Sequence, residues 1–235
     1  TGMSRLIMRV AVFMFFGLFF VMSFNMISAE ADADENVEAQ SLVSKARATF
    51  ESFMADDGMV WLHKNLKDAR GVLIVPQMLK GGFFLGASGG SGVLLVRDEK
   101  TGEWSEPAFY HIGSVSLGLQ VGASAAEVVM LVMTKKGADA LLATRVKPGG
   151  DVSAALGPYG AGMAAKGVTA DIISFARTKG AYLGLSVEGS VIDTADSLNK
   201  AYYGKPVVPA DILIIHNVTN PKSAELRSAL KKAAK

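Results

Sequence analysis

Ser114-Val-Ser-Leu-Gly-Leu-Gln-Val-Gly122 is the stretch of this sequence that decides its fold. It has the period-two pattern of a β-strand with two unlike faces. One face is small and polar, and the other carries the large apolar side chains Val115, Leu117, Leu119 and Val121. The stretch Tyr182–Ile192 repeats the pattern, with Leu183, Leu185, Val187 and Val191 on one parity. Two strands of the same design are expected in one sheet.

Further strands are predicted on both sides of this stretch. Val72–Val75 is continuously apolar between a glycine and a proline, which predicts a strand buried on both faces. Gln77–Gly82 is predicted to be a loop. Phe83–Arg97 is predicted to form two strand segments interrupted at Gly86–Gly92, where glycine permits a bulge or a close backbone approach. The remaining predicted strands are Glu127–Met133, Asp151–Leu156 and Thr169–Ala176.

Helical periodicity is concentrated toward the two ends of the chain. From Val37 onward, apolar residues recur at spacings of three and four: Leu42, Ala46, Phe50, Phe53 and Met54. Other helices are predicted at Met59–Ala69, Gly137–Ala143, Asp193–Ala201 and from Pro221 to the end. Strict strand–helix alternation is missing. The pattern therefore predicts one α+β domain with a mostly antiparallel, curved sheet, barrel- or sandwich-like, and helices at its N- and C-terminal ends.

The first part of the sequence has the three-part pattern of a secretory signal peptide. Arg5 and Arg9 precede an apolar run, and the small-residue segment Ala29-Glu-Ala31 follows. We therefore expect a signal peptide over residues 1–31, a flexible leader over 32–36 and the folded domain over 37–235. The expected location is periplasmic or secreted, with peripheral membrane association. An uncleaved membrane anchor is the alternative, although the apolar run is shorter than the ~20 residues that a spanning helix needs.

Composition excludes several kinds of chemistry. The chain has no cysteine, so it has neither disulfides nor a catalytic thiol. Its formal net charge is +2, which gives no global field to attract nucleic acid. The three histidines are scattered along the chain, and none has a second ligand at metal-binding spacing: His63, His111 and His216. We therefore expect neither a metal nor a cofactor.

One short motif permits an enzymatic hypothesis. Gly86-Ala-Ser88-Gly-Gly90 fits the G-x-S-x-G pattern in which a nucleophilic serine sits on a turn between a strand and a helix. The residues after Ser88 have strand character, which favours a glycine-rich bulge or turn. A serine hydrolase using Ser88 is therefore a distant alternative.

The second predicted helix has a basic outer face made by Lys64, Lys67 and Arg70. Together with Lys80 and Trp104 it forms a candidate membrane-surface patch, because cations attract anionic headgroups and aromatic rings suit the interface. The alternative is an ordinary solvated helix face, since any amphipathic surface helix carries charge.

Six motifs in order give the sequence a family resemblance. The chain resembles the SYLF domain family, also called the actin-regulator lipid-binding domain, over about Val37–Ile215. The motifs are Ala69–Pro76, Gly92–Arg97, Gly102–Pro107, Gly118–Gly122, Gly180–Gly189 and Tyr202-Tyr-Gly204. The resemblance implies a non-enzymatic module that binds phospholipid or phosphoinositide, in which the lipid-binding segment corresponds to Val37–Arg70. Actin binding is not carried over, because an exported protein does not meet cytosolic actin.

We therefore expect an exported protein whose function is to bind an anionic phospholipid membrane. Basic contacts are expected from Lys64, Lys67, Arg70 and Lys80, and apolar or aromatic ones from Phe50, Phe53 and Trp104. An envelope protein–protein interaction module, or a scaffold of the actin-binding type, is the alternative of another class.

Overall fold

A computed structural model describes residues 33–82, 85–117, 122–160, 167–178, 181–183 and 189–235. The signal peptide expected over residues 1–31 lies outside the described residues. So do the central residues of both alternating stretches, 118–121 and 184–188.

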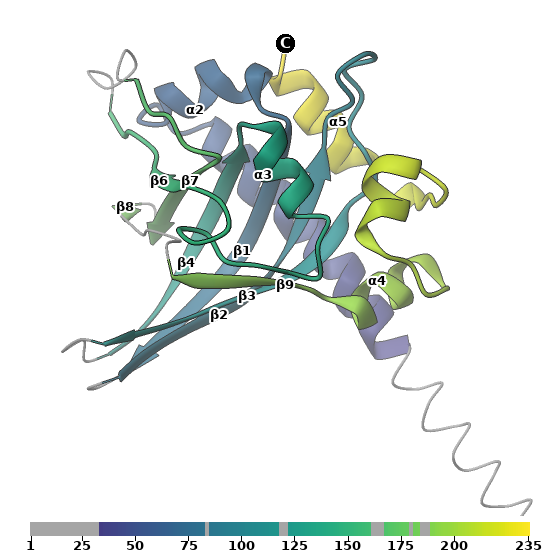
Figure 1. Ribbon diagram of the computed structural model, residues 1–235, viewed down its shortest axis with the longest axis horizontal. Coiled ribbons are helices and arrows are strands. Elements are labelled where there is room, and N and C mark those ends of the chain that lie inside the picture. Colours follow the sequence, from purple (N-terminus) through teal and green to yellow (C-terminus); the bar gives the residue numbers. More distant parts are fainter. Residues whose placement is uncertain (1–32, 83–84, 118–121, 161–166, 179–180, 184–188) are drawn as a thin grey trace, which may run out of the picture.

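The strands form one curled, nine-stranded sheet (Figure 1). Its path is β5-β9-β3-β2-β1-β4-β7-β6, with β8 also paired to β7, and every pairing is antiparallel except β6 with β7. The bounds are β1 Gly71–Gly82, β2 Leu85–Val96, β3 Ala108–Leu117, β4 Gly122–Val132, β5 Arg145–Val146, β6 Ala154–Leu156, β7 Ile172–Thr178, β8 Ala181–Leu183 and β9 Ser190–Thr194. The predicted α+β class and curved, mostly antiparallel sheet are confirmed.

Helices lie at both ends of the chain, as expected. The first is described over residues 33–54. The others are α2 Val60–Asn65, η1 Leu66–Asp68, α3 Lys135–Ala140, α4 Asp196–Tyr203, the π-helix η3 Asp211–Ile215, η4 Pro221–Ser223 and α5 Ala224–Ala233. Within the described part of the chain, no helix combines the length and apolar character needed to cross a bilayer.

The flexible leader expected over residues 32–36 is helical from residue 33. Asn36 explains why, since its side chain donates a hydrogen bond to the carbonyl of Ala201 (2.6 Å) and accepts one from the side chain of Gln40. Contact with the distant α4 therefore orders residues whose own sequence has no helical periodicity.

Two apolar clusters cover the two faces of the sheet. Val72 and Ile74 of β1 point into the cluster shared with the residue 33–54 helix, α2, α4 and α5. Leu73 and Val75 point into the opposite cluster, on the side of α3 and η3. Both faces of this strand are therefore buried, which confirms the prediction for Val72–Val75 and accounts for its continuous apolar sequence.

β1 and β2 are longer and less interrupted than predicted. β1 continues through the predicted loop to Gly82, with a bulge between Ile74 and Leu79 in its pairing with β2. β2 runs without a break through the predicted interruption. Its glycines permit a close approach of the bulged strand, because a Cβ at Gly90 would lie 2.3 Å from the carbonyl oxygen of Gln77.

The stretch Ser114–Gly122, predicted as one strand, belongs to two. β3 ends at Leu117 and β4 begins at Gly122, and the two strands flank the β1–β2 pair in the order β3-β2-β1-β4. The second alternating stretch was also predicted as one strand and also belongs to two, β8 paired with β7 and β9 paired with β3 and β5. Both lie in the same sheet as β3 and β4, as predicted.

Candidate functional site

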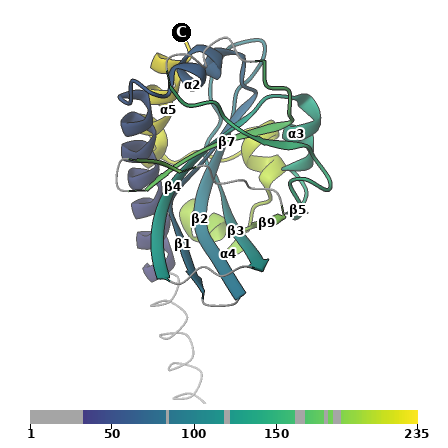
Figure 2. The same ribbon diagram turned by 90° about the vertical axis from the view of Figure 1, so that its left-hand side faces the viewer.

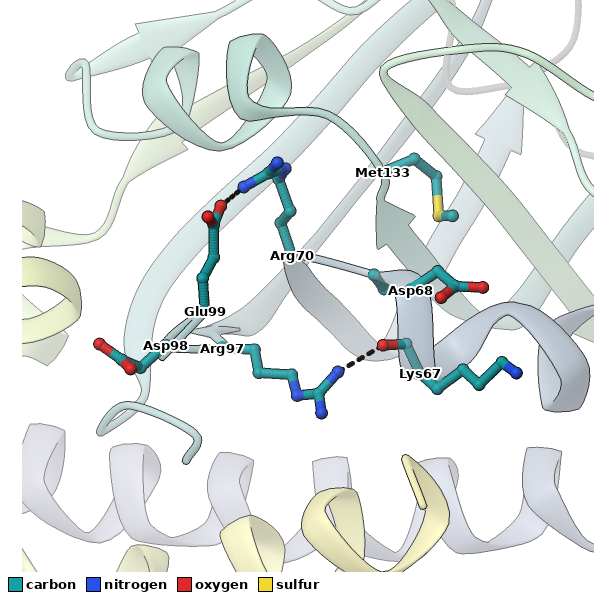
Figure 3. A pocket seen from close by; sticks show the side chains of 8 residues that line it. Lys67, Asp68, Arg70, Arg97, Asp98, Glu99 and Met133 are labelled. Carbon is teal, nitrogen blue, oxygen red and sulfur yellow. Dashed lines mark hydrogen bonds and ion pairs between the residues drawn. The ribbon is translucent and has the colours of Figure 1, made fainter. Parts of the chain in front are cut away.

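A polar hollow of about 280 Å³ lies where η1 leads into β1 and where β2 ends (Figure 3). We call it the polar hollow. Its lining contains equal numbers of basic and acidic side chains: Lys67, Asp68, Ala69, Arg70, Arg97, Asp98, Glu99 and Met133. It therefore contains two of the predicted lipid-binding residues, Lys67 and Arg70.

The two arginines of the polar hollow are held by different partners. Arg70 forms an ion pair with Glu99, and the Arg97 guanidinium donates to the backbone carbonyl of Lys67 (Figure 3). The Arg97 Nε–H is buried and has no hydrogen-bond partner among the described residues. An unsatisfied buried donor of this kind is costly.

A basic surface lies beside the polar hollow, on the elements that line it and on α5. Contacts between α5 and the strand ends build it: Lys231 pairs with Glu103, and Arg227 donates to the carbonyl of Trp104 (2.9 Å). Both ribbon views place the C-terminal end of α5 beside α2 (Figures 1 and 2). We call this surface the basic end and define it by Lys64, Lys67, Arg70, Arg97, Lys100, Lys231, Lys232 and Lys235.

Lys64 and Lys67 are exposed, as their helix positions predicted. Among the described residues, no carboxylate pairs with either ammonium group. The acidic side chains nearby are Asp68, Asp98, Glu99 and Glu103, fewer than the basic ones. The basic end therefore concentrates positive charge in a chain whose formal net charge is only +2.

The apolar and aromatic part of the predicted site is wrong. Phe50, Phe53 and Trp104 are 1%, 0% and 2% exposed and belong to the core cluster under the helices. Phe50 and Phe53 lie on the helix stripe that faces the sheet, and the guanidinium of Arg177 also covers the Phe53 ring at 4.4 Å. None of the three is accessible to a membrane.

Lys80 is separated from the other basic residues. It lies ten residues after Arg70 along β1, roughly 30 Å at strand spacing. Its partners in the ladder are Ser88 and Ser124 on the two adjacent strands. The structure therefore does not bring Lys80 together with the polar hollow.

Ser88 does not have the geometry of a nucleophile elbow. It lies inside β2, whereas the elbow requires a turn between a strand and a helix. Its hydroxyl shares a 2.7 Å hydrogen bond with Ser114. The described residues contain no group of three side chains suited to a metal ion.

A second hollow, of about 430 Å³, shares Met133 with the polar hollow and has Asp171 in its lining. Hydrogen bonds from the Thr134 hydroxyl (2.6 Å) and then from the Ser153 backbone N–H (2.8 Å) lower the pKa of Asp171 to about 2. Lys136 lies 3.6 Å from the same carboxylate. Asp171 thus remains ionised. Its hydrogen bonds connect the N-cap residue of α3 to Ser153, directly before β6, at the start of β7.

Comparison with known proteins identifies the family. The family model Ysc84, described as "Las17-binding protein actin regulator", matches residues 113–233. The chain is 30% identical to the SH3 domain-containing protein PJ696.02 of Schizosaccharomyces pombe over 166 residues, which is 68% of this chain and 38% of that protein.

Two further relatives agree. Identity is 28% over 161 residues to the SH3 domain-containing YSC84-like protein 1 of Bos taurus, covering 67% of this chain and 46% of the relative. It is 32% over 145 residues to the LAS seventeen-binding protein 3 of Saccharomyces cerevisiae, covering 59% and 31%. The chain thus spans less than half the length of each. With the motif order of its sequence and its curled α+β sheet, the chain belongs to the Ysc84 (SYLF) family of actin regulators.

Proposed function

We propose that this chain is a non-enzymatic module that docks on anionic phospholipid, phosphoinositides included, through the basic end. The observation that carries the proposal is that Lys64 of α2 and Lys67 of η1, on the elements that lead into the polar hollow, are exposed and pair with no carboxylate among the described residues. Each lysine or arginine near an anionic membrane surface contributes roughly 1 kcal/mol of attraction.

The polar hollow supplies a place for one phosphate group. A phosphate oxygen can accept from the guanidinium group of Arg97, which belongs to the lining of the hollow. A second oxygen can replace Glu99 as the partner of Arg70, since that ion pair lies in the lining of the same hollow. Charge-assisted hydrogen bonds of this kind are stronger than neutral ones.

Vesicle co-sedimentation tests the proposal. The protein should pellet with phosphatidylcholine vesicles that contain phosphatidylserine and remain in the supernatant with phosphatidylcholine alone. Salt should weaken the binding, because the charges are exposed. The double variant Lys64→Glu/Lys67→Glu should lose most of it.

The control is Lys45→Glu/Lys147→Glu, which makes the same change in charge at two exposed lysines outside the basic end. This control should bind like the unmodified protein. Equal losses in both variants would show that net charge, and not this surface, governs binding.

A protein-binding scaffold is the second candidate, favoured by the family description and by the relatives named for Las17 binding. Capture of a protein partner that is indifferent to Lys64→Glu/Lys67→Glu, together with no binding to vesicles, would support this candidate instead.

We also propose that the chain is exported and meets the membrane from the periplasmic or secreted side. The support is the signal-peptide pattern of residues 1–31. N-terminal sequencing of the protein recovered from its host should give a mature chain that begins directly after Ala31.

A further inference from the structure

The segment after α4 displays large apolar side chains to solvent. Val208, Ile214 and Ile215 are 56%, 53% and 61% exposed. Their neighbours Ile212 and Leu213 are 0% and 2% exposed and belong to the core. Four consecutive apolar residues are thus divided, two pointing inward and two outward.

Local hydrogen bonds stabilise the conformation of residues 208–217, a segment that we call the protrusion. The Asp211 carboxylate accepts from the backbone N–H of Val208 (3.2 Å) and from the side-chain amide of Asn217 (3.3 Å). The π-helix η3 then ends at His216, which has a left-handed backbone conformation with φ 57°. Such a conformation is uncommon outside glycine and persists when surrounding contacts fix it. The exposed positions of Ile214 and Ile215 are therefore fixed by a backbone conformation that specific contacts hold.

The protrusion, the yellow-green segment around η3 in Figure 1, lies on the side of the turn that follows β2, which carries Lys100 of the basic end. The carboxylate of Asp98, in the lining of the polar hollow, has a lowered pKa, mainly through hydrogen bonds from Thr101 and in smaller part through the charge of His216. The η3 segment thus approaches the rim of the polar hollow.

We propose that Val208, Ile214 and Ile215 are the apolar anchor of this domain, entering the outer layer of an anionic bilayer while the basic end binds its headgroups. This inference rests on the proposed function. It supplies the apolar contacts that the sequence assigned to the buried Phe50, Phe53 and Trp104.

Two arguments favour a bilayer over a protein surface as the occupant. Three side chains cover much less than the ~800 Å² per partner that a stable protein interface buries, whereas a membrane anchor needs only a few apolar residues beside cations. In addition, the lysines of the basic end complement the charge of anionic headgroups.

The chain has no cysteine, so a single introduced cysteine gives one labelling site. Ile215→Cys is labelled with an environment-sensitive nitrobenzoxadiazole dye and mixed with phosphatidylcholine/phosphatidylserine vesicles. The emission should shift to the blue, and spin-labelled lipid should quench it. The control is Leu156→Cys, also exposed (41%), at the end of β6, a strand on the opposite side of the domain from η3 in Figure 1, and it should show neither effect.

The outcomes separate the two proposals. Co-sedimentation with no spectral shift at position 215 overturns the anchor and leaves headgroup binding intact. A shift with a protein extract but none with vesicles overturns it in favour of a protein partner. Absence of co-sedimentation in every labelled and unlabelled form overturns the proposed function together with the anchor.

A second variant tests the energetic contribution. Ile214→Ser/Ile215→Ser should weaken vesicle binding about tenfold or more, because the apolar area that leaves water is lost. The salt dependence should stay unchanged, since no charge is altered. Unchanged affinity in a variant with normal circular dichroism overturns the anchor.

Discussion

Replacing Gly90 with alanine should destabilise the fold, whereas the same change at the adjacent Gly89 should not. A Cβ at Gly90 would lie 2.3 Å from the carbonyl oxygen of Gln77 and 3.2 Å from the Cα of Met78. At Gly89 the nearest atom, the carbonyl oxygen of Ile112, would be 3.7 Å away, an ordinary contact. Neither glycine has a positive φ, so the difference between the two variants isolates the close approach of β1.

The magnitude follows from the kind of atoms that clash. Both atoms near the added Cβ are backbone atoms of the β1 bulge, so no side-chain rotation relieves the contact and the strands must separate. Overpacking of this kind costs typically 1–3 kcal/mol, and we expect Gly90→Ala at about 2–3 kcal/mol. Gly89→Ala should be neutral or stabilising by up to about 1 kcal/mol, because alanine restricts the unfolded chain.

Urea unfolding followed by circular dichroism measures both variants. With an m-value of about 2 kcal/mol/M, Gly90→Ala should lower the unfolding midpoint by about 1 M or more. Equal midpoints for the two variants, at unchanged m-value, would refute the role assigned to glycine at the bulge.

Three further predictions concern single side chains. Because Asp171 has a folded pKa of about 2, set first by Thr134, it stabilises the fold above its unfolded pKa of about 4. That stability should fade as the pH falls from about 4 to 2, and thermal melts of Asp171→Asn should lack this pH dependence. Asn199 is fully buried and hydrogen-bonds both backbone groups of Phe109, so Asn199→Ala should cost about 2–3 kcal/mol in urea unfolding. A fluorophosphonate probe should leave Ser88 unlabelled, because its hydroxyl contacts another serine, and labelling there would revive the hydrolase hypothesis.

Much of the fold was predictable because both kinds of periodicity are strong. The continuous apolar run Val72–Val75 predicted a strand covered on both sides, and the two clusters cover it. The bulge in β1 was not predictable, since it depends on how Gln77 meets Gly90 of the neighbouring strand. The helical state of residues 33–36 escaped for a similar reason, because the contact of Asn36 with α4 joins residues 165 positions apart.

The site was predictable only where a local rule decides exposure. The helix period placed Lys64 and Lys67 outward, and they are outward. The error at Phe50 and Phe53 has a physical reason: an amphipathic helix has one apolar stripe, and in this domain that stripe covers the sheet. The role of Arg97 could not be predicted from the sequence, which shows only that it follows a strand. Its unsatisfied Nε–H results from tertiary packing.

The two apolar clusters on either side of the sheet also determine which positions of the domain can accept amino-acid substitutions. A strand enclosed on both faces tolerates few substitutions, so new contacts with other molecules can arise only along the rims, at turns and on the outer surfaces of helices. Relatives with about 30% identity, several of them named for an SH3 domain, can therefore keep the same interior while exchanging what they recognise. Surfaces that bind other molecules are therefore expected at the ends and edges of this sheet and on the outer sides of its helices.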